Sequence, residues 1–244
     1  MENIITIFKR ELTGYFETPV AYVFIIVFLL VSGVFTFYLG GFFGSGRADL
    51  QSFFSWHPWL YLFLIPAISM RLWAEERRAG TLELLLTLPI SSTEAVMGKF
   101  LAAWCFSAIT LFFTFPIWLT VNYLGDPDNG VIIISYLGSL LLSGAFLSIG
   151  ACMSSLTRNQ VISFVASVSV CFIFVVSGFP MVLDFFTALG FPQVIVDTVS
   201  SFSFIANFEE ITKGVLSFKN ILFFISIISL WLFINVGIIQ VKRA

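Results

Sequence analysis

Charged residues are scarce in this sequence, and that scarcity excludes an ordinary soluble domain. Asp, Glu, Lys and Arg make up only 11% of the 244 residues, whereas soluble domains carry about 25% charged residues. Hydrophobic residues account for 59% of the chain. A surface with so few charges must face lipid or other apolar helices, so the composition indicates a membrane protein.

Residue types that form catalytic and metal sites are scarce as well. The one histidine, His57, has no carboxylate or second ligand near it in the sequence. The three cysteines (Cys105, Cys152 and Cys171) fall inside apolar runs, where they are expected to be small packed side chains. No H-E-x-x-H motif and no pair of cysteines at ligand spacing occurs. The sequence therefore predicts no catalytic, cofactor-binding or metal site, and it disfavours an intramembrane enzyme.

The chain also lacks a nucleotide-binding loop. Its single Gly-Lys pair, Gly98-Lys99, is followed by Phe100 and has no upstream glycine at P-loop spacing. Ionisable residues in the middle of apolar runs, which proton- or ion-coupled carriers use, are missing too. We therefore expect the chain not to be an enzyme, and any energy for transport to come from another subunit.

What the sequence does contain is a series of apolar runs long enough to cross a bilayer, for which about 20 residues are needed. They lack the polar alternation of barrel strands, so helices are predicted. Together they predict one all-α polytopic domain over residues 1–244 with six transmembrane helices. The expected spans are Pro19–Leu39, Trp56–Leu72, Gly98–Val121, Val131–Met153, Val161–Val182 and Ile221–Gln240.

Basic residues give the expected orientation of these spans. With six spans and an inner amino terminus, nine Lys and Arg residues lie inside and three outside. The inner set is Lys9, Arg10, Arg71, Arg77, Arg78, Lys99, Arg158, Lys242 and Arg243, and the outer set is Arg47, Lys213 and Lys219. By the positive-inside rule, both termini are predicted to be cytoplasmic in a multi-pass inner-membrane protein.

An amphipathic segment precedes the first span. Ile5, Phe8, Leu12 and Tyr15 recur at helical spacing, with polar residues between them. This pattern predicts an N-terminal interfacial helix on the inner leaflet. Thr18 and Pro19 follow as an expected N-cap and first-turn proline of the first span.

The densest run of charged residues begins at Arg71 and lies between the second and third spans. Gly80 is expected to end a helix there, and the leucines of 82–88 to form a second short helix that stops at Pro89. Ser91 and Glu94 form a capping box that starts the third span. Two interpretations remain open: the loop docks a soluble partner, or it is an amphipathic elbow resting on the membrane.

Residues 181–219 are apolar but interrupted by charges, Gly190 and Pro192, so they offer no run of spanning length. Short outer re-entrant helices before the last span fit this pattern. Irregular backbone at membrane depth is tolerated only beside protein or a water-filled cavity. We therefore predict an outer gate in this segment that includes Pro192, Phe208 and Gly214.

Several of these segments together resemble a known family. The loop sequence EERRAGTLELLLTLP (75–89), followed by Ser-Ser-Thr-Glu and Gly98-Lys99, is similar to the signature loop of ABC type-2 (ABC-2) exporter permeases. Phe8–Leu12 before the first span and Asn207–Val215 before the last also match that pattern. The similarity covers nearly the whole chain and is greatest to the gliding-motility-associated branch.

This resemblance implies a permease subunit that exports or moves a substrate with ATP hydrolysed on separate cytoplasmic ATPase subunits. It implies a second permease subunit, identical or paired, and no cofactor or nucleic acid bound by this chain. The implied coupling region, which docks the ATPase through a cytoplasmic coupling helix, comprises Glu75, Glu76, Arg77, Gly80, Thr81, Glu83 and Leu85.

A second hypothesis, from a different class, involves no transport. A membrane scaffold would recruit a soluble partner through the same 71–99 loop and move nothing. The 31 phenylalanines could line a route for lipids or sugars, but packing and lipid contact also explain them. The sequence therefore assigns no substrate.

Overall fold

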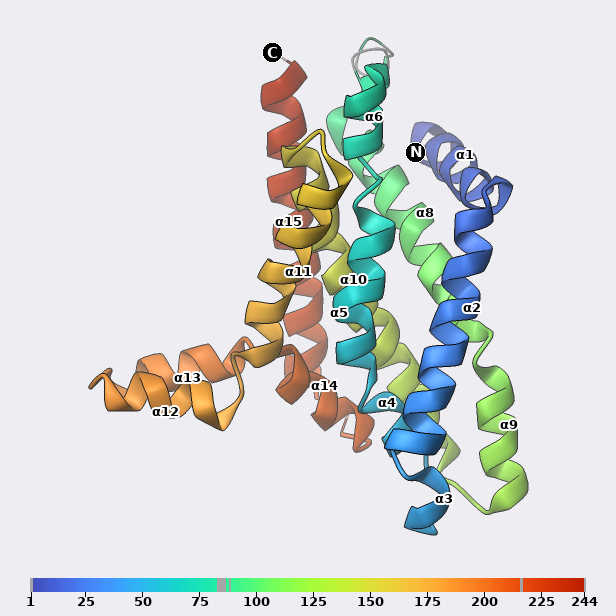
Figure 1. Cartoon of the computed structure of the whole chain (residues 1–244). Coiled ribbons are helices and arrows are strands. Elements are labelled where there is room, and N and C mark those ends of the chain that lie inside the picture. Colours follow the sequence, from blue (N-terminus) through green and yellow to red (C-terminus); the bar gives the residue numbers. More distant parts are fainter. Residues whose placement is uncertain (1, 83–86, 88, 216, 244) are drawn as a thin grey trace.

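The fold is a bundle of helices, seen in a computed structural model that describes residues 2–82, 87, 89–215 and 217–243. The chain is 83% helical, and the described ranges contain no strand. This confirms the predicted all-α class. Both termini and helix α6 lie at one end of the bundle (Figure 1). We call that end the charged end, and the other the opposite end.

The amino-terminal helix α1 (Glu2–Glu17) lies across the charged end of the bundle, at an angle to α2 (Figure 1). Ile7 is its buried residue, whereas Ile5 is exposed. The helix was predicted, and Leu12 and Tyr15 of its expected apolar face pack against the core. Ile5 does not, because the helix presses against α8 (Ser92–Phe112). Pro19 then occupies the first turn of α2 (Pro19–Val34), which continues through the π-helical turn η1 (Phe35–Leu39) towards α3 (Phe42–Ser45).

Helix α5 (His57–Ser69) lies between α2, α10 and α11 and follows the short helix α4 (Gln51–Phe54). Nine of its thirteen residues are buried. At 1.5 Å per residue it is roughly 20 Å long, shorter than the roughly 30 Å hydrocarbon core of a bilayer. The expected second span, Trp56–Leu72, therefore takes the form of a short helix enclosed by its neighbours.

Helix α10 (Asn129–Leu156) is the centre of the bundle and packs against α5, α8, α11, α14 and α15 (Phe218–Arg243). Glycines allow this close packing. A Cβ built on Gly138 would lie 2.6 Å from Ile211 Cγ2, and one on Gly150 would collide with Ser69. Helix α9 (Phe115–Leu124) continues α8 towards the opposite end. Small residues at these contacts let the backbones approach, as helices in membranes require.

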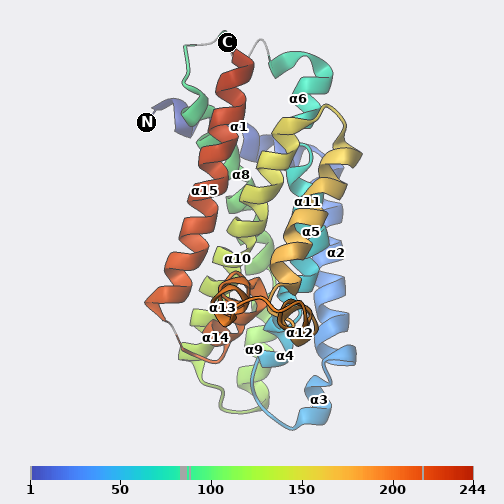
Figure 2. The same cartoon turned by 90° about the vertical axis from the view of Figure 1, so that its left-hand side faces the viewer.

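Helix α11 (Gln160–Val176) is shorter than the expected span Val161–Val182, because the chain bends by 79° before α12 (Pro180–Ala188). Gly178 and Pro180 lie at the bend, where a Cβ on Gly178 would collide with Ser203. Helices α12 and α13 (Gln193–Ser201) fold back on each other and project sideways from the bundle (Figures 1 and 2). We call this pair the arm. Helix α14 (Phe204–Thr212) returns the chain to the bundle.

Four helical segments are long and apolar enough to cross a membrane, or five if α11 and α12 are one broken span. The four are Pro19–Gly44, Ser92–Leu124, Asn129–Leu156 and Phe218–Lys242. These support a polytopic membrane protein. They do not confirm six spans, since α5 falls short of the length and α11 needs α12 to reach it.

Candidate functional site

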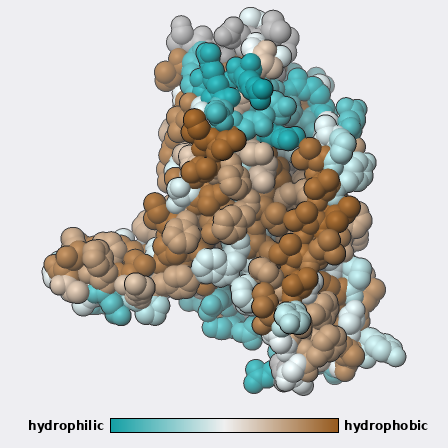
Figure 3. Space-filling model, in the orientation of Figure 1, coloured by the Kyte–Doolittle hydropathy of each residue, from teal (hydrophilic) through white to brown (hydrophobic). Residues whose placement is uncertain are grey.

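Polar side chains gather at the charged end of the bundle, where α6 (Ala74–Ala79) projects beside α1 and the start of α8. Figure 3 shows this end as hydrophilic above a largely hydrophobic middle. The segment that the sequence predicts as the coupling region is therefore set apart from the apolar bundle. Its side chains fall into two groups, one buried against other helices and one exposed.

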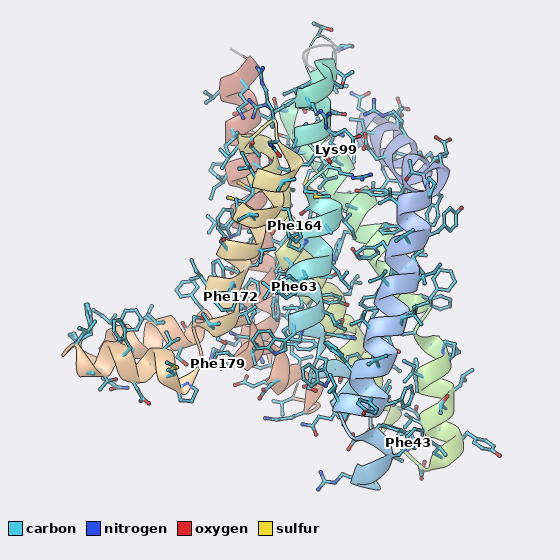
Figure 4. All side chains as sticks on the ribbon, viewed as in Figure 1. Phe43, Phe63, Lys99, Phe164, Phe172 and Phe179 are labelled. Carbon is cyan, nitrogen blue, oxygen red and sulfur yellow. The ribbon has the colours of Figure 1, made fainter. Side chains whose placement is uncertain are left out.

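Lys99 on α8 is the centre of the buried group (Figure 4). Its side chain is 3% exposed, and its Nζ lies 2.8 Å from Glu76 Oε1 and 3.1 Å from Glu11 Oε1. One ammonium group thus pairs with a carboxylate from α6 and a carboxylate from α1. A buried charge is tolerated only when it is paired, so Lys99 holds three helices that are far apart in the chain.

The residue before Lys99 makes this arrangement possible. A Cβ built on Gly98 would lie 2.7 Å from Ile7 Cγ2, closer than side-chain carbon atoms pack. The absence of a side chain at this position lets α1 lie directly on α8. With α1 so close, Glu11 is within reach of Lys99, and Tyr15 stacks on Phe106 with ring centroids 5.0 Å apart.

Two further groups complete the cluster. Arg10 lies 2.5 Å from Glu11 Oε1 and 3.6 Å from Glu76 Oε1, and the Lys99 ammonium lies 5.3 Å from the centre of the Trp73 ring. Burial raises the pKa of the Glu11 carboxyl, but Lys99 and Arg10 outweigh it, so the pKa is lowered from its ordinary value of 4.5. We call Arg10, Glu11, Glu76 and Lys99 the charge cluster.

The other side of α6 is bound to the end of α10. The backbone amides of Trp73 and Ala74 each donate to Ser154 Oγ at 3.1 Å. Arg77 donates to the Ser155 carbonyl at 3.0 Å, and Lys242 of α15 donates to the same oxygen. Burial and the nearby charge of Arg158 lower the pKa of Arg77. Helix α6 is thus held by α1, α8 and α10 together.

The exposed group lies on the outer surface of α6 and just after it. Glu75, Gly80 and Thr81 are exposed. Gly80 ends α6 in the left-handed region with a φ of 71°, as predicted, and the Thr81 hydroxyl donates to the Glu76 carbonyl at 3.3 Å. Glu83, Leu85 and the expected helix over 82–88 lie largely outside the described residues.

The predicted coupling residues that the structure describes therefore divide between these two groups. Glu76 and Arg77 point to other helices of this chain, whereas Glu75 is free to meet a partner. Sequence reasoning missed Lys99 and Glu11, which bind Glu76. The one available signal was the position of Lys99 itself. It lies four residues after Ala95, on a side of α8 where the other positions are buried and apolar.

The residues of the predicted outer gate lie in different places at the opposite end. Pro192 is the N-cap of α13, in the turn at the tip of the arm. Phe208 on α14 is buried, with its ring centroid 6.5 Å from that of His57. Gly214 follows α14 with a φ of 82°, and a Cβ there would lie 2.8 Å from Val131 Cγ2. The structure brings Phe208 and Gly214 into the bundle but leaves Pro192 on the arm.

His57 belongs to the packing of the bundle at this end. It is fully buried, and its Nδ1 lies 2.8 Å from Ser139 Oγ, which is also 2.7 Å from the Tyr61 hydroxyl. The rings of Phe53 and Phe54 meet it edge-on. Throughout the part of the chain that the structure describes, no three His, Cys, Asp or Glu side chains are placed to hold a metal ion.

Comparison with known proteins identifies the family. No curated protein matches the chain. The sequence model of the family described as ABC-2 family transporter protein matches residues 59–241 of the 244. The match begins within α5 and ends within α15, and it includes α6, Lys99 and the arm. It therefore includes the segments that build the charged end, except α1. The chain belongs to the ABC-2 family of transporter proteins.

Proposed function

We propose that this chain is the permease subunit of an inner-membrane ABC exporter, in which two permease subunits, identical or paired, bind two ATPase subunits. Family membership supports a membrane-embedded permease without its own ATPase domain that works with an ABC ATPase. The finer parts of the proposal are export, the inner membrane, six crossings with α5 and the bent α11–α12 pair included, and the gliding-motility branch.

The observation that carries the proposal is the placement of α6. It projects from the charged end with Glu75 and Arg78 exposed, and its inner face is tied to α1, α8 and α10. A docking element must present charges to its partner and also resist being pushed aside. Helix α6 meets both requirements, so an ATPase that binds it could move the helices attached to it.

Coupling in this proposal passes through the charge cluster. When the ATPases close on ATP, displacement of α6 would pull Lys99 through Glu76 and α1 through the shared contact of Lys99 with Glu11. Because α1 leads directly into α2, the first span would move with the start of α8. Such a displacement changes access to the transport pathway only if the ATPase binds the permease with different affinity before and after these helices move.

At the opposite end, we propose that α12, α13 and α14 form the outer gate. Phe208 and Gly214 would be its fixed part, since both pack within the bundle. Pro192 would be at its outermost point, in the turn of the arm. The arm has room to move because none of the residues of α12 is buried.

Co-purification with a candidate ABC ATPase from the same genome tests the docking step. The variant carries Glu75→Lys and Arg78→Glu, two exposed charges whose reversal leaves the charge cluster intact. We expect ATPase binding to weaken about tenfold, because charges at the rim of an interface govern its assembly and specificity. The matched control is Lys219→Glu, an exposed charge reversal at the opposite end of the bundle.

Unchanged ATPase binding by the double variant would overturn docking through α6. Binding without any ATP-dependent effect on the reconstituted permease would instead support the scaffold function. Orientation is tested separately with a cysteine at position 78 in a variant without native cysteines. We expect a water-soluble maleimide to label it only from the cytoplasmic side, and labelling from the outside would overturn the topology.

A further inference from the structure

A groove runs along the face of the bundle between α2 and α5, starting at the charged end. Its volume is about 630 Å³, within the roughly 300–1,000 Å³ of sites for small molecules. The apolar wall comes from one face of α2 and one of α5. Its residues are Val20, Ala21, Val23, Phe24, Val27, Leu64, Ala67 and Ile68. Figure 3 shows hydrophobic side chains over the middle of this face.

Polar residues are confined to the end of the groove near α1 and α6. Lys99, Glu11 and Glu76 line it there, but their charges are already paired with one another. Glu17 and Glu75 also line it and are exposed, so water solvates their carboxylates. The groove therefore has a long apolar part and a short charged rim, which is the shape of an amphiphile lying along the bilayer normal.

Arg71 is a further cation in this rim. It follows α5 and is half-buried, and none of the ion pairs between described residues includes it. Its Nε atom is buried with no hydrogen-bond partner. A buried donor without an acceptor is costly, and guanidinium groups pair well with phosphate oxygens. The Arg71 guanidinium thus has no anionic partner among the described residues.

We propose that this groove binds one phospholipid from the leaflet at the charged end, with its phosphate on Arg71 and an acyl chain between α2 and α5. The lipid bilayer supplies such a ligand at the depth where the groove lies. The phosphate would pair with the part of the Arg71 guanidinium that lines the groove, while Val23, Val27 and Leu64 would cover the chain. A headgroup ammonium, where present, would face Glu17 or Glu75.

Lipid binding can be measured on the purified, delipidated permease without any ATPase, so its outcome is independent of the docking test. The probes are phosphatidylglycerol, phosphatidylethanolamine and the neutral diacylglycerol with the same chains. We expect both phospholipids to bind at one per chain and diacylglycerol to bind roughly ten- to a hundredfold more weakly, as the loss of a charged hydrogen bond implies. A photoactivatable phospholipid should crosslink to residues 20–27 and 64–71.

Two variants separate the two parts of the site. Arg71→Gln should weaken phospholipid binding and leave diacylglycerol binding unchanged, and Ala67→Trp should block both by filling the groove. The controls are Arg158→Gln, an exposed arginine at the same end, and Ala166→Trp, a half-buried alanine on α11. Equal binding of all three lipids, crosslinks spread over the outer faces of α9 and α15, or unaltered binding by both groove variants would each overturn the proposal.

Discussion

The ammonium of Lys99 lies 2.8 Å from the Glu76 carboxylate, so the projecting helix α6 is joined to α8 by a contact that is almost fully buried. The same ammonium binds Glu11 of α1 at 3.1 Å. These three residues are separated by long stretches of sequence, yet they hold the charged end together. The fold thus places a buried cluster of ion pairs directly beneath the segment that we propose docks the ATPase.

Replacing Lys99 by methionine should destabilise the protein by about 3 kcal/mol, because it leaves two partly buried carboxylates without a cation. The measurement is thermal unfolding in detergent, followed by the fluorescence of Trp73 and its neighbours. Adding Glu11→Gln and Glu76→Gln to Lys99→Met should recover much of the loss, since the uncompensated charges are then removed. A triple variant no more stable than Lys99→Met would contradict this account.

The stability of the charged end should depend on pH through Glu11. Its pKa is lowered in the folded protein, so its contribution is fully present above its ordinary value of 4.5 and is lost as the pH falls through the depressed value. Unfolding temperatures measured from pH 7 to pH 3 should therefore converge for wild type and Glu11→Gln. In the control Glu17→Gln, which removes an exposed carboxylate, the profile should follow that of the wild type.

Gly98→Ala should push α1 away from α8, because the new methyl group would lie 2.7 Å from Ile7. We expect a loss of about 1–3 kcal/mol from overpacking and faster proteolysis of α1. The companion change Ile7→Ala should recover only part of the loss when combined with it, since the Cβ of residue 7 would still lie 2.8 Å from the new methyl group. Gly237→Ala is the matched control, since no atom lies within 4 Å of its added Cβ and alanine favours a helix. Equal effects at the two glycines would refute the role of Gly98.

The arm should lie in the membrane surface with its apolar side towards lipid. Phe185 is 61% exposed and Ile195 is 40% exposed, although neither residue could face water at low cost. In vesicles of a variant without native cysteines, a cysteine at position 185 or 195 should resist a water-soluble maleimide. A cysteine at position 184 or 197, where aspartates now stand, should react. Equal reactivity at all four positions would show an arm surrounded by water.

Local signals in the sequence predicted several of these features correctly. The capping box holds as expected, with Glu94 N–H donating to Ser91 Oγ at 3.2 Å and Ser91 N–H donating to Glu94 Oε2 at 2.9 Å. Gly80 ends α6, and the helix of the first span begins at Pro19. Each of these depends on residues within one or two helical turns, which is the range over which a single sequence is informative.

Features that depend on distant residues could not be predicted in the same way. Hydropathy treats Trp56–Leu72 as a span, but it cannot show that α5 is short and enclosed by α2, α10 and α11. The bend after α11 depends on the close approach of Gly178 to Ser203. The charge cluster combines Lys99 with Glu11, which is 88 residues away, so no local pattern could have shown that Glu76 faces inward.

The interruption between α5 and α6 determines which route a force on α6 would take. Residues 70–73 form turns rather than continuous helix, while Lys99 and the Ser154 hydroxyl fasten α6 sideways to its neighbours. A push on α6 would therefore reach α1, α8 and α10 before it travelled down the chain into α5. Among these helices, α5 would therefore be the last to be displaced.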